Sequence, residues 1–261
     1  MELGSTPKEI RQAIRQGRYA GGTAGLAPGY VQANLVILPQ GQAYDFLVFC
    51  QRNPRPCPLI EVTDPGNPEP IGVAPGADLR TDVPRYRLYR EGHLADEVGD
   101  ISAHWRDDFV AFLLGCSFTF EHAMQEAGLP LRHLEESRIV PMFRTNLQCR
   151  PSGIFRGPMV VSMRPIPAPL VPRAVTVTAR YPMAHGAPVH VGTPAQIGIA
   201  DVHTPDWGEP ATILSGEEPV FWACGVTPQA VALEARPPLV ITHAPGHMFI
   251  TDLPDHALSV L

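Results

Sequence analysis

Proline is the residue type that most restricts how this chain can fold. The sequence has 30 prolines in 261 residues, about twice the usual share. Each proline fixes φ and lacks a backbone N–H, so it is disfavoured inside helices and central strands. Hydrophobic residues make up 44% and charged residues 18%, a globular composition. We therefore expect a compact protein with many rigid loops, where functional residues often lie.

The charged residues exclude several classes of function. The net charge of −6 disfavours a surface for nucleic acid or for an anionic membrane. Lys8 is the only lysine, and it falls in an expected first helical turn. Schiff-base chemistry with pyridoxal phosphate or a carbonyl substrate is therefore largely excluded. The remaining basic residues are arginines, whose guanidinium groups can bind carboxylates through two parallel hydrogen bonds.

Cysteine usage and hydropathy predict a soluble cytoplasmic protein. The five cysteines are odd in number and have no CxxC spacing, which disfavours a disulfide scaffold or a zinc ribbon. The first residues, MELGSTPKEIRQ, are charged where a signal peptide needs an apolar segment. The longest nearly apolar run, residues 109–120, is too short to span a bilayer.

The first half of the chain is expected to alternate helices with strands. A T-x-x-E box at Thr6 and Glu9, with Pro7 in the first helical position, predicts an N-terminal helix. The pattern favours further helices at residues 30–39, 41–52, 105–115 and, after Cys116 and Ser117, up to Gly128. Strands are expected within residues 58–66 and 84–92.

The second half predicts the fold class. Strands are expected at 138–146, 157–167 and 188–192, with a helix at 171–182, which makes a small α+β unit of residues 131–193. Strands near 219–226 and 238–244 then flank a helix at 227–236. Such alternation is typical of parallel sheets. We therefore predict an α/β fold, with a layered, largely parallel main sheet built from residues 1–130 and 194–261.

Generic catalytic signatures such as GxGxxG, GxxxxGK, HExxH and GxSxG are absent. Several unusual phrases remain instead: FCQRNPRPCPLIEVTDPG, GCSFTFEHA, VPMFRTN, VVSMRP, HGAPVHVGTPAQIGI, PVFWACGVTPQ and ITHAPGHMFITD. Together, from about residue 10 to the C-terminus, they resemble the D-glutamate cyclase family, whose bacterial members are called hydro-lyases. The resemblance implies cyclisation of D-glutamate to 5-oxo-D-proline with loss of water, an activity of amino-acid metabolism.

This reaction sets requirements that the sequence must meet. The α-amine must lose a proton to attack, the developing oxyanion needs donors, and a carboxylate needs an anchor. The segment GCSFTFEH is the best candidate for a site, because Ser117 would lie at a helix N-terminus that favours an anion. Glu121, one turn further, is a candidate general base. For Ser117 and Glu121 a structural role is as well supported as a functional one: Ser117 would only cap the helix and Glu121 would be solvated. For Cys116 the structural role is favoured, because free cysteines are often small, buried core residues.

Arginines near strand ends are candidates for binding the substrate. Arg144 and Asn146 in FRTN close an expected strand, and Arg164 lies in SMRP. Each arginine alone is more often a structural ion-pair partner. At least one of the two is expected to hold a carboxylate, since the substrate is a dicarboxylate.

Histidines supply further candidates for proton transfer. His190 is expected in a strand and His243 in a rigid loop after the last strand. Both are candidate acids or bases. The competing interpretation is that each histidine is buried in the core with its hydrogen bonds made inside the protein. His243 and His247 are four residues apart, but Pro245 and Gly246 between them exclude a helical metal clamp. We expect no metal and no organic cofactor. A catalytic metal is the lesser alternative, with further ligands from His185, His190 and His203.

The resemblance thus implies a carbon–oxygen lyase that takes a small amino acid or dicarboxylate, and the sequence leaves the oligomeric state open. Two alternatives stay open. One is dehydration or hydrolysis of another small amino or hydroxy acid. The other is a carboxylate-binding protein without turnover.

Overall fold

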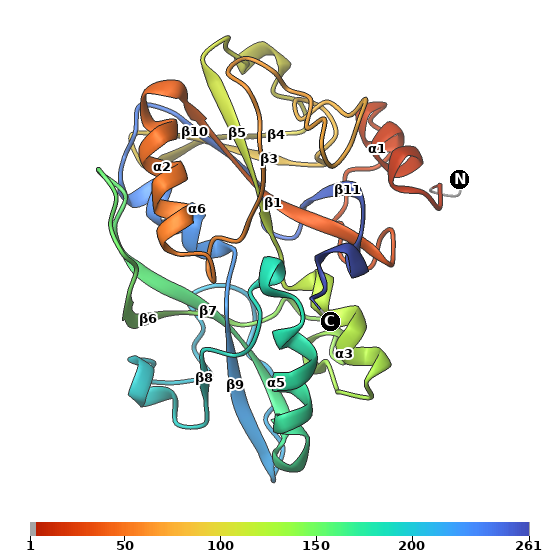
Figure 1. Ribbon diagram of the computed structural model, residues 1–261, viewed down its shortest axis with the longest axis vertical. Helices are drawn as coiled ribbons and strands as arrows, with labels where there is room; N and C mark the ends of the chain where they lie inside the picture. The colour runs from red at the N-terminus through yellow and green to blue at the C-terminus, as the bar shows by residue number, and fades with distance from the viewer. Residues whose placement is uncertain (1–3, 261) are drawn as a thin grey trace.

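The computed structural model describes residues 4–260 and shows two antiparallel sheets with helices packed around them (Figure 1). Across those residues the strands form a sheet of seven and a sheet of four. The larger sheet fills the upper part of the view and the smaller sheet the lower part.

The larger sheet is built from both ends of the chain. Its order is β2 (Leu59–Val62), β5 (Phe109–Gly115), β1 (Tyr30–Pro39), β10 (Val240–His243), β3 (Tyr86–Arg90) and β4 (His93–Val98). Strand β11 (Phe249–Pro254) pairs with the beginning of β1. The long central strand β1 therefore organises the sheet.

The smaller sheet comes from the middle of the chain. Its order is β6 (Met142–Gln148), β7 (Pro158–Pro167), β9 (Glu217–Ala223) and β8 (His190–Val191). Three of these strands begin within residues 131–193, whereas β9 joins from outside that range. The predicted domain boundaries themselves stay a prediction.

The helices pack against the sheets and between them. They are α1 (Pro7–Arg15), α2 (Gln40–Arg52), α3 (Phe118–Glu126), α4 (Arg132–Glu135), α5 (Val171–Ala179) and α6 (Val226–Glu234). Short 3₁₀ helices occupy loops at Ser102–His104, Ala168–Leu170, Pro182–Ala184, Pro194–Ile197 and Asp255–Leu258. Helices α2 and α6 cover one face of the larger sheet, where Phe46 and Val231 share a core with Val36 and Phe112. Helices α3 and α5 share another core with Trp222 of β9.

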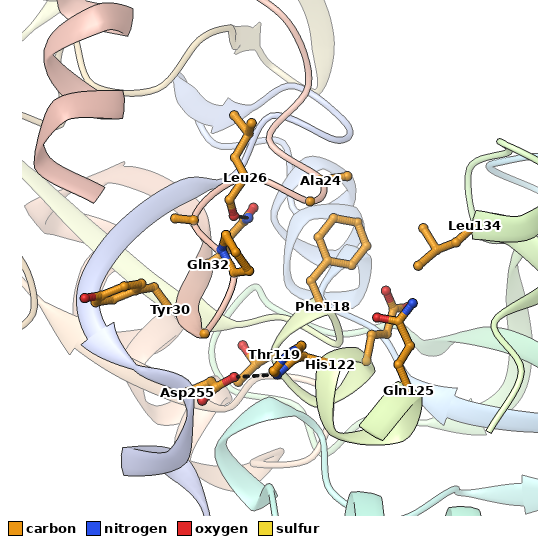
Figure 2. A pocket seen from close by; sticks show the side chains of 15 residues that line it. Ala24, Leu26, Tyr30, Gln32, Phe118, Thr119, His122, Gln125, Leu134 and Asp255 are labelled. Carbon is orange, nitrogen blue, oxygen red and sulfur yellow. Dashed lines mark hydrogen bonds and ion pairs between the residues drawn. The ribbon is translucent and has the colours of Figure 1, made fainter. Parts of the chain in front are cut away.

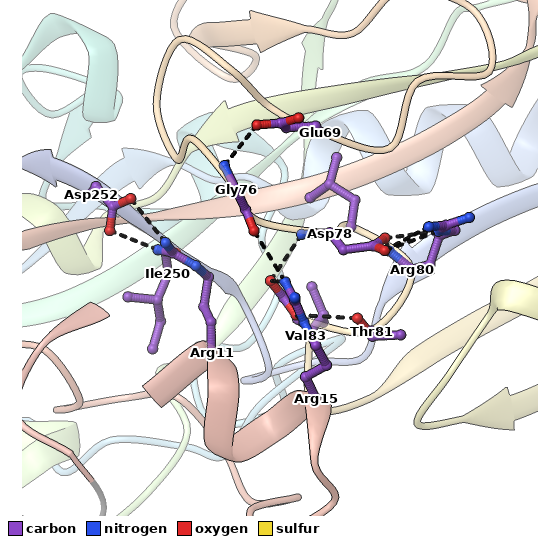
Figure 3. Close-up of polar contacts among 12 residues, drawn as sticks. Arg11, Arg15, Glu69, Gly76, Asp78, Arg80, Thr81, Val83, Ile250 and Asp252 are labelled. Atoms are coloured by element: carbon purple, nitrogen blue, oxygen red, sulfur yellow. Dashed lines mark hydrogen bonds and ion pairs between the residues drawn. The ribbon is translucent and has the colours of Figure 1, made fainter. Parts of the chain in front are cut away.

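Two arginine–carboxylate pairs fix helix α1 to β11 and to the segment that precedes β3 (Figure 3). Both terminal nitrogens of Arg11 donate to Asp252 of β11 at 2.9 Å, and one also donates to the Ile250 carbonyl. Arg15 donates twice to Asp82, whose side chain is fully buried, at 2.7 and 2.6 Å. Two parallel hydrogen bonds in each pair fix both the position and the orientation of the paired side chains. They therefore anchor the start of the loop that runs from α1 to β1.

The prediction of a largely parallel sheet is wrong. Every strand pair recorded within residues 4–260 is antiparallel. The strand–helix–strand pattern of β9, α6 and β10 was the main argument for parallel pairing. The structure shows that α6 instead connects two different sheets, because β9 belongs to the smaller one and β10 to the larger one.

Two predicted helices are strands. Residues 30–39 form β1, and residues 109–115, within the helix predicted at 105–115, form β5. In β1, Leu35 and Ile37 enter one core while Val36 and Leu38 enter another. A strand buried on both faces has no polar alternation, so its sequence looks like a buried helix segment. The capping box of α1, helices α2, α3 and α5, and strands β2 and β3 are confirmed.

The described helices include none with the length and apolar character needed to cross a membrane.

Candidate functional site

Three residues predicted from the sequence meet in one buried cluster. Ser117 precedes the first residue of α3, Glu121 lies one turn into that helix, and Arg164 lies on β7. The Nε of Arg164 donates to Oε1 of Glu121 at 3.0 Å, and its Nη2 donates to the same oxygen. Nη2 also donates to the Ser117 hydroxyl at 3.0 Å. The junction between β5 and α3 therefore faces the middle of β7.

The guanidinium of Arg164 is enclosed. Its Nη1 donates to the Ser162 hydroxyl at 3.0 Å, and its central carbon lies 5.3 Å from the Phe120 ring centroid and 5.4 Å from that of Trp222. The residue has no exposed surface. Arg164 thus acts here as an internal counter-ion of Glu121, and it does not line the neighbouring cavity. The sequence prediction that it holds a substrate carboxylate stays a prediction.

His133 is a second partner of Glu121 that the sequence interpretation missed. It lies on the short helix α4, is 3% exposed, and its Nε2 is 3.2 Å from Oε1 of Glu121. Burial raises the pKa of the Glu121 carboxyl, but Arg164 and His133 outweigh burial, so the pKa lies below its ordinary value. Glu121 is therefore ionised at neutral pH.

A cavity of about 220 Å³ lies directly beside this cluster (Figure 2). Glu121 lines it, together with Phe118 and Thr119 from the first turn of α3. The opposite wall comes from the loop of residues 24–29 and from the beginning of β1. His122 and Asp255 lie on its floor in Figure 2, with Nδ1 and Oδ2 3.5 Å apart. A space of this size can hold a small amino acid.

Two buried polar atoms of the cavity wall have no partner within the described structure. They are Oε1 of Gln32 and Oγ1 of Thr119, on residues that are 4% and 3% exposed. Buried polar groups are normally hydrogen-bonded, so unpartnered polar atoms in a cavity wall indicate that a ligand or a water molecule forms the missing hydrogen bonds. Neither residue is among those predicted from the sequence motifs. A usable signal was present for Gln32, a polar residue within the apolar run YVQANLVILP.

His243 lies in a different cavity, of about 150 Å³, beside Gln229 of α6 and Arg87 of β3. The Leu35 N–H donates to its Nδ1 at 3.0 Å, and the Gln229 side-chain amide lies 2.9 Å from the same atom. Burial lowers the pKa of His243 to about 4. The ring is therefore neutral at pH 7, and the structure does not bring it to Glu121.

The remaining predicted residues lie in the smaller sheet, away from the Glu121 cavity. The ring of His190 is 2.9 Å from the Thr193 carbonyl. The guanidinium of Arg144 stacks over the Trp207 ring at 5.1 Å. The side-chain amide of Asn146 is 3.5 Å from a backbone carbonyl. Their predicted catalytic and binding roles stay predictions.

No cluster of three or more histidine, cysteine or carboxylate side chains within residues 4–260 is arranged to hold a metal ion. The ring of His247, the second histidine of the THAPGH segment, lies 2.8 Å from the Pro245 carbonyl.

The cavity combines an ionised carboxylate, a helix N-terminus and unsatisfied polar atoms, which is the arrangement of a small-molecule site. The family described as D-glutamate cyclase matches residues 110–252, which include β5, α3, α4 and β7. The chain therefore belongs to the D-glutamate cyclase family, and the resemblance seen in the sequence is confirmed.

Curated relatives cover nearly the whole chain. A protein of Stutzerimonas stutzeri is 64% identical over 98% of this chain and 97% of its own length. A protein of Thermoanaerobacter pseudethanolicus is 64% identical over 97% of this chain and 96% of its own length. A protein of Rubrobacter xylanophilus is 65% identical over 95% of this chain and 95% of its own length. Each is named "Putative hydro-lyase", which supports the prediction of a carbon–oxygen lyase.

Among solved structures, a nitrogen repressor-like protein from Methanococcus jannaschii aligns over 93% of this chain and 97% of its own chain. Its TM-score is 0.38 at 9% identity, too low to support a conclusion about fold or function.

Proposed function

We propose that this protein is a hydro-lyase that cyclises D-glutamate to 5-oxo-D-proline, with release of water, in the cavity beside Glu121. Membership of the D-glutamate cyclase family supports the reaction. One structural observation supports the place: the ionised Glu121 lines a cavity while buried partners fix its orientation.

In this reaction the α-nitrogen forms a bond to the γ-carbon, and a γ-carbon–oxygen bond breaks. The ammonium group gives up two protons, and the departing oxygen takes up two to leave as water, so no co-reactant is needed. Glu121 accepts the two protons from the nitrogen one after the other and passes each to the departing oxygen. Its low pKa makes it a weak base that releases the proton readily, which suits a shuttle between two substrate atoms.

The other groups of the cluster hold Glu121 in place. Arg164 and His133 both contact Oε1 and keep the carboxylate ionised, so they are positioning residues in this scheme. The first turn of α3 presents Phe118 and Thr119 to the cavity, and the positive end of the helix dipole favours the developing oxyanion. Holding the folded conformer of the substrate supplies a further part of the acceleration, because the ring closure is intramolecular.

The test follows 5-oxoproline by mass spectrometry after incubation with D-glutamate or L-glutamate. Wild-type protein should form product from the D-isomer. Glu121→Gln keeps the side-chain shape but removes the proton acceptor, so it should lower the rate about 10²- to 10⁴-fold. Glu126→Gln, on the exposed end of the same helix, is the matched control and should retain the wild-type rate. Absence of product from wild-type protein, or full activity of Glu121→Gln, would contradict the proposal.

A second candidate is dehydration of another small amino or hydroxy acid. It is favoured by the cavity lining, which among its described residues contains no arginine or lysine to hold a second carboxylate. Incubation with a panel of such acids and detection of products lighter by one water would distinguish it from the cyclase.

A further inference from the structure

Gln32 lines the cavity beside Glu121, and its side-chain amide has one buried acceptor without a partner. Its Nε2 donates to the Thr23 carbonyl at 2.8 Å and to the Leu26 carbonyl at 3.0 Å. Both donors are therefore used to hold the loop that closes the cavity. A flipped amide would place Oε1 against these two carbonyl oxygens, so the contacts fix the orientation. Oε1 remains a buried acceptor without a partner.

The titratable side chains that line the cavity include two carboxylates, which are acceptors, and His122, which pairs with Asp255. All recorded contacts of the Glu121 carboxylate go to Oε1, which leaves Oε2 available to a ligand. Asp255 adds a second carboxylate to the lining (Figure 2). No arginine or lysine is among the described lining residues. An unpaired acceptor in a cavity that two carboxylates line favours a positively charged donor over an anion.

Thr119 occupies a different electrostatic position. Its unpartnered hydroxyl lies in the first turn of α3, where the positive end of the helix dipole favours negative charge. This hydroxyl therefore suits a substrate carboxylate. Of the two unpartnered side chains, Gln32 therefore suits a cation and Thr119 an anion.

We propose that Gln32 is the residue that selects an amino acid as the ligand, by accepting a hydrogen bond from its α-ammonium group through Oε1. The inference rests on the proposed function, since it assigns the recognition of the substrate in that same cavity. An ammonium group has three donors, which Gln32 Oε1 and Glu121 Oε2 engage together. A dicarboxylate without an amine leaves the Gln32 oxygen buried and unpaired, and so binds more weakly.

The test compares D-glutamate with glutarate, which lacks only the amine, by isothermal titration calorimetry. Wild-type protein should bind D-glutamate about tenfold or more tightly than glutarate. Gln32→Met keeps the side-chain length but removes Oε1, so this preference should fall to near one. The variant also loses the two donors that hold the loop, which weakens both ligands by a common factor. The ratio of the two affinities therefore isolates the contribution of Oε1.

Thr119→Val is the matched control. It removes the other orphaned polar atom, so it should weaken both acids alike and leave the ratio unchanged. Three results would overturn the proposal: binding of neither acid to wild-type protein, equal binding of both, or an unchanged ratio in Gln32→Met. A ratio that falls only in Thr119→Val would overturn it as well. Binding of Mg²⁺ alone that is lost in Gln32→Met, without discrimination between the acids, would assign the acceptors to a metal instead.

The same data separate this inference from the proposed reaction. If the amine preference depends on Gln32 but no 5-oxoproline forms, amine recognition stands and the cyclase proposal fails. If product forms but the ratio of affinities is the same in Gln32→Met, the cyclase proposal stands and the role of Gln32 fails.

Discussion

Replacing Arg164 by methionine should destabilise the protein strongly, because it leaves a buried carboxylate without its main counter-ion. Arg164 is fully buried and the Glu121 side chain is 7% exposed. Removing one partner of a buried ion pair typically costs about 3–5 kcal/mol. Methionine can still fill the space between Phe120 and Trp222, so the lost charge should account for most of this cost. The double variant Glu121→Gln, Arg164→Met should lose less than the two single variants added together.

The cost should also depend on pH, and the sign follows from the pKa of Glu121. In the wild type that pKa is lowered, so the carboxylate contributes stability above its unfolded pKa, and this is lost as pH falls through the folded pKa. Without Arg164, burial dominates and should raise the pKa above its unfolded value. As pH falls, protonation of Glu121 then removes the buried charge and lowers the cost of its burial in the variant. The cost should be smaller at pH 5 than at pH 8, by about 1.4 kcal/mol for each unit by which the new pKa exceeds 5.

Urea unfolding followed by tryptophan fluorescence measures both effects. Arg106→Met is the matched control, because Arg106 pairs with Asp108 at 2.7 Å while both side chains are largely exposed. Exposed pairs contribute about 0–1 kcal/mol. If Arg164→Met costs no more than Arg106→Met, or costs the same at pH 5 and pH 8, the argument from a buried ion pair is refuted.

Three further predictions concern stability and reactivity. Since burial lowers the pKa of His243 from 6.5 to about 4, its neutral form should contribute stability above pH 6.5 that is lost as pH falls towards 4, up to about 3 kcal/mol. Urea unfolding of His243→Gln at pH 7 and pH 4.5 should show a weaker pH dependence than the wild type, and an equal dependence would contradict this. Burial raises the pKa of the Cys116 thiol to about 12, so iodoacetamide at pH 8 should label it only after unfolding; labelling of the native protein, detected by mass spectrometry, would argue against burial. Gly115→Ala should cost about 1–3 kcal/mol or more in thermal or urea unfolding, because the new Cβ would lie 1.8 Å from the Met183 carbonyl oxygen. Gly41→Ala, in a helix with open space around it, should be neutral or stabilising, and equal costs at the two positions would refute the steric argument.

Local signals in the sequence predicted local structure well. The capping box at Thr6 and Glu9 is present with both of its hydrogen bonds, because it depends only on residues three apart. The phrase GCSFTFEH placed Ser117 and Glu121 correctly at the first turn of a helix. Arg164, predicted as an arginine near a strand end, lies within β7 and contacts both of them.

What the sequence could not supply was pairing between distant segments. Strand direction depends on which sheet each strand joins, and no local pattern shows that α6 leads from one sheet to the other. His133 reaches Glu121 only through the placement of the short helix α4, which has no sequence signature of function. The orphaned oxygen of Gln32 became visible only when both donors of the same amide were located.

The position of β10 between β1 and β3 has a consequence for synthesis on the ribosome. The four residues of β10 follow all the strands of the smaller sheet in the chain, yet they lie near the centre of the larger one. Until they leave the exit tunnel, the edges of β1 and β3 that pair with β10 stay open, although both strands are synthesised early. Open strand edges are the usual starting points of aggregation. The larger sheet is therefore completed only after the whole smaller sheet has been made, and its unpaired edges stay open to other chains during that time.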